Sequence, residues 1–481
     1  MREDADTTVI IASFLLLLTA ITASGAMAFI RKRKTPEDYL VASRRVPPWL
    51  SALSTVATNN SGFMFIGMIA YAYRIGVQSV WMMVGWIVGD LLMWIFVHPG
   101  VRRVSGRHEV ASLPGLVAME PGGRPARPVA VVAGLVTVVF LAVYAAAQLK
   151  AGSTALHVLF DWDMSVGALI GTGIVILYSY AGGIRADIWT DAAQSFVMIL
   201  AMGLILAAGV EQVGGPVALA GVLEAQDPAL TRWMPRDLTF GFAPFVVGFT
   251  FAGMAAAGQP HLMTRIMSIG GTGGIRRAGF YYFGWFIPFF IASIGVGLYT
   301  RAILPDLESL AIARELEEPT ELALPLITLK LLPDVVVGVA LAGLFAATVS
   351  TADSQLIVCS GALTQDVRPR WQDSYLATKA GTLSVTAIAL GVALFAPEGV
   401  FSLVLIAWSA LGASLAPILV IRLLRWPLTV PTALGMMTAA TLVVAAWHLS
   451  PFDDDVLEAL PGALAAAAVY GVGRVIALRR G

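Results

Sequence analysis

Residues 53–67 read LSTVATNNSGFMFIG, a polar stretch in the middle of an apolar segment that runs from about 48 to 73. Five polar or flexible residues follow one another there, namely Thr58, Asn59, Asn60, Ser61 and Gly62. Asn and Ser compete with the helical backbone for hydrogen bonds, and Gly weakens a helix further. Lipid cannot satisfy freed backbone groups, so irregular backbone at this depth must line a cavity. The stretch predicts a broken helix at a functional site, with a packed polar helix interface as the alternative.

The composition around this stretch is that of a membrane protein. Of the 481 residues, 58% are apolar and 13% are charged, against about 25% charged in soluble domains. The net charge is zero, so no overall field favours nucleic acid as a partner. The single cysteine, Cys359, excludes an internal disulfide, and no sequence pattern resembles a phosphate-binding loop or an H-E-x-x-H motif. We therefore expect no enzyme, no ATP-driven pump and no organic cofactor.

Thirteen stretches are long and apolar enough to cross a bilayer, which takes about 20 residues each. They lie at about 8–30, 48–73, 77–99, 128–156, 160–181, 187–210, 238–266, 278–302, 324–361, 375–395, 399–420, 427–447 and 457–477. The predicted fold is an all-α integral membrane protein, with the whole chain, 1–481, as a single transporter domain. The oligomeric state stays open.

Charged residues orient these spans. If the N-terminus is outside and each span changes side, 23 Lys and Arg fall on inner segments, including Arg31–Lys34, and six on outer segments. Cytoplasmic loops carry such an excess, so the pattern predicts a cytoplasmic C-terminus and a location in the plasma (inner) membrane.

A second break is predicted in the seventh span, which contains FAGMAAAGQPHLMTR. Gly253 and Gly258 precede Gln259-Pro260, and proline removes a helical hydrogen bond. The two breaks lie five spans apart, so their helices run in opposite directions. This arrangement indicates a five-plus-five inverted repeat with a shared midplane site. The repeats would be 48–210 and 238–420, preceded by an extra span, 8–30, and followed by two more in 427–477.

Two further spans carry polar residues suited to an ion. In the ninth span, Ser350 and Ser354 share one helical face, next to Thr351 and Asp353. Hydroxyls and carbonyls are hard oxygen ligands that suit a hard cation, although Ser and Thr often bond back to their own helix. In the sixth span, Asp191 is either functional or an interfacial partner of Arg185.

Two isolated charges complete the set of candidates for coupling. Asp90 lies deep in the third span, where an acid costs about 3 kcal/mol or more and is a functional hypothesis by default. A helix–helix hydrogen bond is the alternative. Lys150 could meet a substrate carboxylate, or it could extend outward or pair with an acid.

Four stretches together resemble the sodium/solute symporter family. They are LSTVATNNSG, AGGIRADIWTDAAQ, GQPHLMTRIMS and LFAATVSTADSQLIVCSGALTQD, which occur in this order across spans two to nine. The last two are quite specific to the family. The resemblance implies thirteen spans, an outside N-terminus and the inverted repeats already expected from the breaks.

The resemblance also implies a sodium site. By position, the ligands would be the carbonyls of Ala57, Asn60 and Ala347 and the hydroxyls of Ser350 and Thr351. Some members hold a second sodium, whose matching positions here are Asp191, Ser350, Asp353 and Ser354. Asp353 stands where those members have a hydroxyl.

The positions that contact proline in proline-carrying members are only partly retained. Ser61, Gly62 and Tyr144 match, and Gln259 lies in the corresponding break. Ala252 and Ala256 replace large aromatic residues, which predicts a roomier cavity unless neighbours such as Phe251 or Met254 fill it. Asn59 replaces an Asp that the proline carrier needs for tight sodium binding.

These features together predict a sodium-coupled symporter that imports a small solute by alternating access. An amino acid such as proline, or another small carboxylate, is the expected solute, and its partners are sodium and the bilayer. The alternatives are a proton-coupled or uncoupled carrier, suggested by Asn59 and Asp90, and a sensor built on a transporter scaffold.

Overall fold

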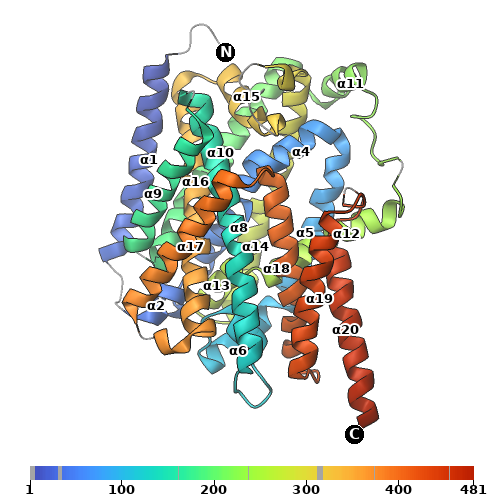
Figure 1. Ribbon diagram of the computed structural model, residues 1–481. Coiled ribbons are helices and arrows are strands. Elements are labelled where there is room, and N and C mark those ends of the chain that lie inside the picture. Colours follow the sequence, from blue (N-terminus) through green and yellow to red (C-terminus); the bar gives the residue numbers. More distant parts are fainter. Residues whose placement is uncertain are drawn as a thin grey trace.

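The computed structural model is a bundle of helices (Figure 1). It describes residues 6–30, 35–160, 162–181, 183–236, 238–310, 318–372, 374–453 and 455–480. The basic run Arg31–Lys34, used above to orient the first span, lies outside these residues. The helices of the first part of the chain are α1 (Thr7–Ile30), α2 (Pro36–Val41), α3 (Pro48–Gly62), α4 (Met68–Ile75), α5 (Val80–Phe96), α6 (His98–His108), α7 (Leu113–Ala118), α8 (Arg127–Phe160), α9 (Met164–Ala181), α10 (Gly183–Val213) and α11 (Pro216–Gln226).

The remaining helices follow a less regular outer segment. They are α12 (Phe242–Met254), α13 (Pro260–Ser268), α14 (Gly273–Ile303), α15 (Ala323–Leu331), α16 (Asp334–Gly361), α17 (Tyr375–Phe395), α18 (Val400–Leu423), α19 (Val430–His448) and α20 (Ala459–Arg480). The start of α1 and the end of α20 lie at opposite ends of the bundle (Figure 1). An odd number of membrane crossings gives this arrangement.

Within the described residues, nine helical segments are long and apolar enough to cross a membrane, or ten if a bent pair counts as one span. Two shorter apolar helices, Thr7–Ile21 and Met164–Leu177, coincide with two more of the predicted spans. One of the nine, Pro48–Phe96, covers two predicted spans at once. The protein is therefore an all-helical, multi-pass membrane protein, and the number of thirteen spans stays a prediction.

The predicted break in the second span is present but narrower than expected. The helix continues through Asn60, and Ser61 alone leaves it, with φ 21° and ψ −157°. Five residues of π-helix, Phe63–Gly67, follow before α4 begins. The prediction of a break in this stretch is confirmed, and the departure from helical geometry is confined to Ser61.

The break in the seventh span separates α12 from α13. A short 3₁₀ turn, Ala255–Gly258, follows α12, and Gln259 is extended with φ −87° and ψ 108°. Pro260 then begins α13, where its missing N–H costs nothing because the first helical N–H has no partner. The two pieces meet at 57°.

The predicted ninth span, 324–361, was wrong at its start. Pro333 separates α15 from α16, so the single span is α16 and α15 is a separate short helix. The apolar window of α16 is 83% buried inside the protein and that of α20 only 22%, which places α16 at the centre and α20 at the periphery.

Candidate functional site

The break in α3 lies against α8 and α16. The N–H of Gly62 donates to Oε1 of Gln148 on α8, at 2.9 Å. A methyl carbon added at Gly62 would lie 2.6 Å from Cβ of Ala151 and 2.9 Å from Cγ2 of Thr348. Only glycine permits this approach, which brings the broken backbone next to the polar face of α16.

Buried polar atoms without partners collect around the two breaks. Ser61 and Gln259 occupy the breaks themselves, and Tyr144 lies on α8 opposite them; all three are 0% exposed. Within the described part of the chain, Oε1 of Gln259 has no hydrogen-bond partner, and the hydroxyls of Ser61 and Tyr144 lie beside each other with no other partner. Tyr144 also packs edge-on against His261, whose ring nitrogens are likewise unsatisfied. Buried polar groups are normally bonded, so these groups can accept a polar solute.

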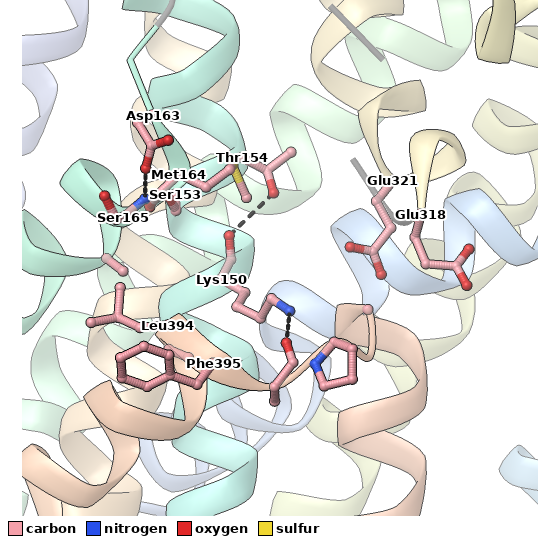
Figure 2. A pocket seen from close by; sticks show the side chains of 15 residues that line it. Lys150, Ser153, Thr154, Asp163, Met164, Ser165, Glu318, Glu321, Leu394 and Phe395 are labelled. Atoms are coloured by element: carbon pink, nitrogen blue, oxygen red, sulfur yellow. Dashed lines mark hydrogen bonds between the residues drawn. The ribbon is translucent and has the colours of Figure 1, made fainter. Parts of the chain in front are cut away.

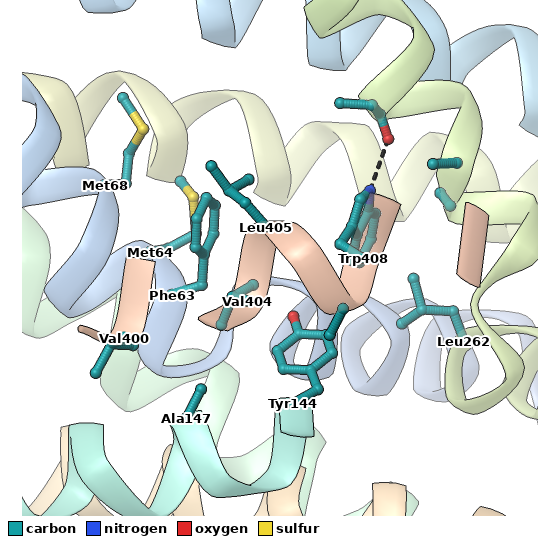
Figure 3. Packing of buried hydrophobic residues seen from close by; sticks show 14 of the residues in the cluster. Phe63, Met64, Met68, Tyr144, Ala147, Leu262, Val400, Val404, Leu405 and Trp408 are labelled. Carbon is teal, nitrogen blue, oxygen red and sulfur yellow. Dashed lines mark hydrogen bonds between the residues drawn. The ribbon is translucent and has the colours of Figure 1, made fainter. Parts of the chain in front are cut away.

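An aromatic wall closes one side of this region. The indole of Trp408, on α18, donates to the carbonyl of Ala252 at 2.8 Å, and Trp86 packs 5.2 Å from it. Gln259 in turn donates to the Trp408 carbonyl at 2.9 Å. Figure 3 shows Trp408 next to Tyr144 in the same cluster. Trp408 thus reaches Ala252 from a distant helix, whereas the neighbours named above as able to fill the space beside Ala252 are Phe251 and Met254.

The residues proposed as sodium ligands come from α3 and α16. Ala57 and Asn60 lie in the last turn of α3 before the break, and Ala347, Ser350 and Thr351 lie on α16; all five are at most 3% exposed. The Ser350 hydroxyl donates to Asp191 at 2.7 Å and approaches Asp187 at 3.3 Å. Ser350 thus connects the proposed ion site with the acids of α10.

A buried arginine organises those acids. Nη2 of Arg265, on α13, lies 2.7 Å from Asp187 and 2.6 Å from Asp191. The three side chains are at most 1% exposed. Ser54 donates to Asp191 and accepts from Nε of Arg265, both at 2.7 Å. We call Arg265, Asp187, Asp191, Ser54, Ser350 and Ser354 the Arg265 cluster.

The cluster joins four helices that are far apart in the sequence. Ser354 of α16 donates to Asp187 at 2.6 Å and accepts from Arg265 at 2.7 Å. The Ser51 hydroxyl of α3 donates to the Arg265 carbonyl, so α3, α10, α13 and α16 are bonded together. With both carboxyls ionised, the two carboxylates and one guanidinium carry a net charge of −1 in a buried site, and one additional monovalent cation nearby would neutralise it.

The comparison with known families now decides the class of protein. Residues 39–438, well over half of the chain, match the sodium:solute symporter family. The chain belongs to the sodium:solute symporter family.

Relatives of this symporter include proline transporters. It is 26% identical over 437 residues to a high-affinity proline transporter of Bacillus subtilis (strain 168), covering 88% of this chain and 89% of that one. It is 27% identical to a sodium/proline symporter of Escherichia coli (strain K12), covering 92% and 88%.

Solved structures share its fold. A sodium-coupled sialic acid symporter, in a substrate-bound outward-open state, superposes with a TM-score of 0.75 at 19% identity, over 96% of both chains. Mhp1, a nucleobase-cation-symport-1 family transporter in a closed conformation, superposes with a TM-score of 0.58 at 13% identity, over 92% of this chain and 95% of that one. The symporter is thus a multi-pass membrane transporter and not an enzyme.

One sequence interpretation of the symporter's charges was wrong. Arg185 does not pair with Asp191; it pairs with Asp38 of α2, because Arg265 already occupies that carboxylate. Arg265, one of the 23 Lys and Arg counted above on inner segments, is 0% exposed inside the bundle. The available signal was an arginine five residues after Pro260, on the half-helix that a break would place inside the bundle.

The three candidate coupling residues lie in two different parts of the structure, with Asn59 and Asp90 in one and Lys150 in the other. Asn59 donates to the Tyr282 hydroxyl at 2.6 Å, and Tyr282 also interacts with Asp90, so the structure brings Asn59 and Asp90 together. Lys150 donates instead to the carbonyls of Ala396 and Glu398, at 2.8 and 2.7 Å.

Lys150 and Gln148 face different parts of the protein. The two residues are two positions apart on α8 and point about 200° apart, since each residue turns the helix by about 100°. Lys150 lines a cavity of about 370 Å³ with Asp163, Glu318 and Glu321 (Figure 2). There, burial raises the pKa of Glu321, in the turn before α15, to about 7.

Proposed function

We propose that this symporter imports one small solute with one sodium ion. The solute is an amino acid such as proline, or another small carboxylate. The sodium ligands are the carbonyls of Ala57, Asn60 and Ala347 and the hydroxyls of Ser350 and Thr351. Supporting this assignment, these residues lie at the end of α3 and on the facing surface of α16, and hard oxygen donors suit Na⁺.

The charge of the Arg265 cluster is the basis for the proposed ratio of one sodium ion per solute. Its net charge of −1 is neutralised by a single sodium beside Ser350, which bonds to Asp191 at 2.7 Å. A second sodium among Asp191, Ser350, Asp353 and Ser354 would compete with the Arg265 guanidinium, which contacts Asp191 and Ser354 at 2.6 and 2.7 Å. We therefore propose that Arg265 replaces the second ion as a permanently attached cation.

The solute site proposed here lies at the breaks, beside Ser61, Gly62, Tyr144 and Gln259. Ala252 and Ala256 form the seventh-span face of this site, with Trp408 as an additional wall. The hydroxyls of Ser61 and Tyr144 and the amide oxygen of Gln259 support this assignment. These buried groups would replace hydrogen bonds that a zwitterion makes with water.

Alternating access would follow from the five-plus-five repeat, 48–210 and 238–420, rocking around these breaks. Sodium entering from outside ties α3 to α16 and favours solute binding. The membrane potential contributes about 2.3 kcal/mol per charge per 100 mV to the inward step. In the proposed orientation, the protein lies in the plasma (inner) membrane with its N-terminus outside and its C-terminus in the cytoplasm.

A proton-coupled carrier is the second candidate, because Asp90 is 1% exposed and its Oδ2 atom has no hydrogen-bond partner among the described residues. Uptake of labelled amino acids and short carboxylates into proteoliposomes, with a sodium gradient or a proton gradient, separates the two. The sodium hypothesis is wrong if a proton gradient alone drives uptake.

Substitution of Ser350 and Thr351 tests the ion site itself. Ser350→Ala and Thr351→Ala should each raise the sodium concentration for half-maximal uptake by about tenfold, since losing one ligand costs about 1.4 kcal/mol. Ser384→Ala is the matched control, because Ser384 is exposed on α17 and bonds only to its own helix at Ala380. Unchanged sodium dependence in both variants would show that the site is misplaced.

A further inference from the structure

A second cluster of ionisable side chains lies at the connection between α19 and α20, at the periphery of the bundle. His448 is the last residue of α19, Glu458 immediately precedes α20, and Asp453 lies in the turn between them. The family match covers residues 39–438 and so ends before these three residues.

The spacing of the three side chains suits one metal ion. Nδ1 of His448 lies 3.2 Å from Oδ2 of Asp453 and 3.8 Å from Oε1 of Glu458. One ligand atom from each residue lies within 4.8 Å of the others. Ligands about 2.0–2.1 Å from a tetrahedral zinc ion are about 3.3 Å apart, so small side-chain adjustments bring all three into range.

Glu458 supplies an independent reason to expect a cation. It is 0% exposed, its carboxyl lies beside that of Asp453 and 3.8 Å from Nδ1 of His448, and within the described residues its oxygens make no hydrogen bond to any side chain outside these three. Oδ1 of Asp453 is likewise buried. Two buried carboxylates this close repel one another, and a protonated His448 would offset only one of the two acids. A divalent cation would neutralise both while His448 stays neutral.

The surroundings hold these ligands in place. Nε2 of His448 lies 3.5 Å from the Ser402 hydroxyl on α18, the kind of outer contact that orients metal-bound histidines. The indole of Trp447 donates to the Val456 carbonyl at 2.8 Å, and Asp455 accepts from the Thr239 N–H at 2.8 Å. The connection is thus fixed on both sides of the cluster.

We propose that His448, Asp453 and Glu458 bind one zinc ion. One imidazole nitrogen and two carboxylate oxygens form a mixed N/O donor set, which suits zinc better than magnesium or calcium. The Asp453 side chain is 31% exposed, so water completes the coordination from that side. The ion clamps the α19–α20 connection and, through Ser402, the start of α18. Its role is structural and independent of the sodium-coupled site.

Calorimetric titration with zinc tests the proposal on the full-length protein in detergent, purified without a polyhistidine tag and treated with a chelator. The wild type should bind one zinc and gain thermal stability. Glu458→Gln and His448→Asn should each lower the zinc affinity about a hundredfold or more. His108→Asn and Glu211→Gln, both exposed and distant in sequence, are the matched controls and should bind as the wild type does.

Any of the following binding results would overturn the zinc site. They are no binding to the wild type, equal affinity in Glu458→Gln, and equal stabilisation by magnesium. A stabilising effect of zinc on Glu458→Gln as large as on the wild type would also refute it. Since Gln is isosteric with Glu and removes a buried charge, Glu458→Gln should remain folded and keep the test decisive.

Discussion

The Arg265 cluster and the region around Ser61 are both polar and both buried, yet they differ in how their polar atoms are satisfied. In the cluster, Arg265 bonds to both Asp187 and Asp191, and these three side chains also bond to serines of two other helices, α3 and α16. Around the breaks, within the described residues, Oε1 of Gln259 has no protein partner, and the hydroxyls of Ser61 and Tyr144 have none besides each other. The polar atoms of the first region are therefore bonded by the protein itself and hold helices together, whereas those of the second retain free capacity for hydrogen bonds to a ligand.

Replacing the Arg265 guanidinium by a neutral group should destabilise the Arg265 cluster, and this is the largest effect that we expect. Arg265→Gln leaves two buried carboxylates without a counter-charge, and breaking a buried pair costs about 3–5 kcal/mol. We expect a large fall in melting temperature and in the yield of folded protein. Arg276→Gln, an exposed arginine early in α14, is the control. A melting temperature equal to that of the control would mean that the cluster contributes no stability.

Neutralising one acid should separate ion coupling from stability. Asp191→Asn keeps the shape of the side chain but changes the charge beside Ser350, so the sodium concentration for half-maximal uptake should rise by about tenfold in folded protein. The sodium-to-solute ratio, measured from isotope fluxes, should be one. A measured ratio of two would contradict the replacement of the second ion by Arg265, and a pure loss of stability would reduce Asp191 to a structural ion pair.

Adding a bulky side chain to the region around Ser61 should have the smallest effect of the three, and this effect should depend on the size of the solute. Ala256→Tyr adds an aromatic ring opposite Trp408, and it should weaken uptake of the native solute by a few fold, with larger analogues losing more than proline. Overpacking itself costs about 1–3 kcal/mol, so melting temperature is measured alongside uptake. If uptake of every solute stays unchanged, this face of the seventh span does not line the solute site.

Local chemistry made the breaks predictable. Gly258 and Pro260 disfavour a continuous helix whatever surrounds them, and Asn59, Asn60 and Ser61 do so at the other break. The positions of Ser350 and Ser354 on one face of α16 also followed from helical periodicity alone. These features depend on residues within a few positions of one another, which is the range that a sequence pattern reports.

The partners of the charged residues could not be predicted in this way. Arg265 and Asp187 are 78 positions apart and meet only because the break turns α13 toward α10. Arg185, six residues from Asp191, looked the better partner, but the structure gives it to Asp38. Trp408 similarly covers Ala252 from 156 positions away. Such contacts depend on how whole helices pack, so pattern and propensity leave them open.

The two breaks also place helix ends in the middle of the bundle. Each helix end carries roughly half an elementary charge, negative at a carboxyl end and positive at an amino end. The end of α3 before Ser61 thus offers a partial negative charge to a cation, and the start of α13 at Pro260 offers a partial positive charge to a carboxylate. The backbone itself can therefore distinguish the two ends of a zwitterion. The partial charges at the helix ends do not titrate, so this discrimination does not change with pH.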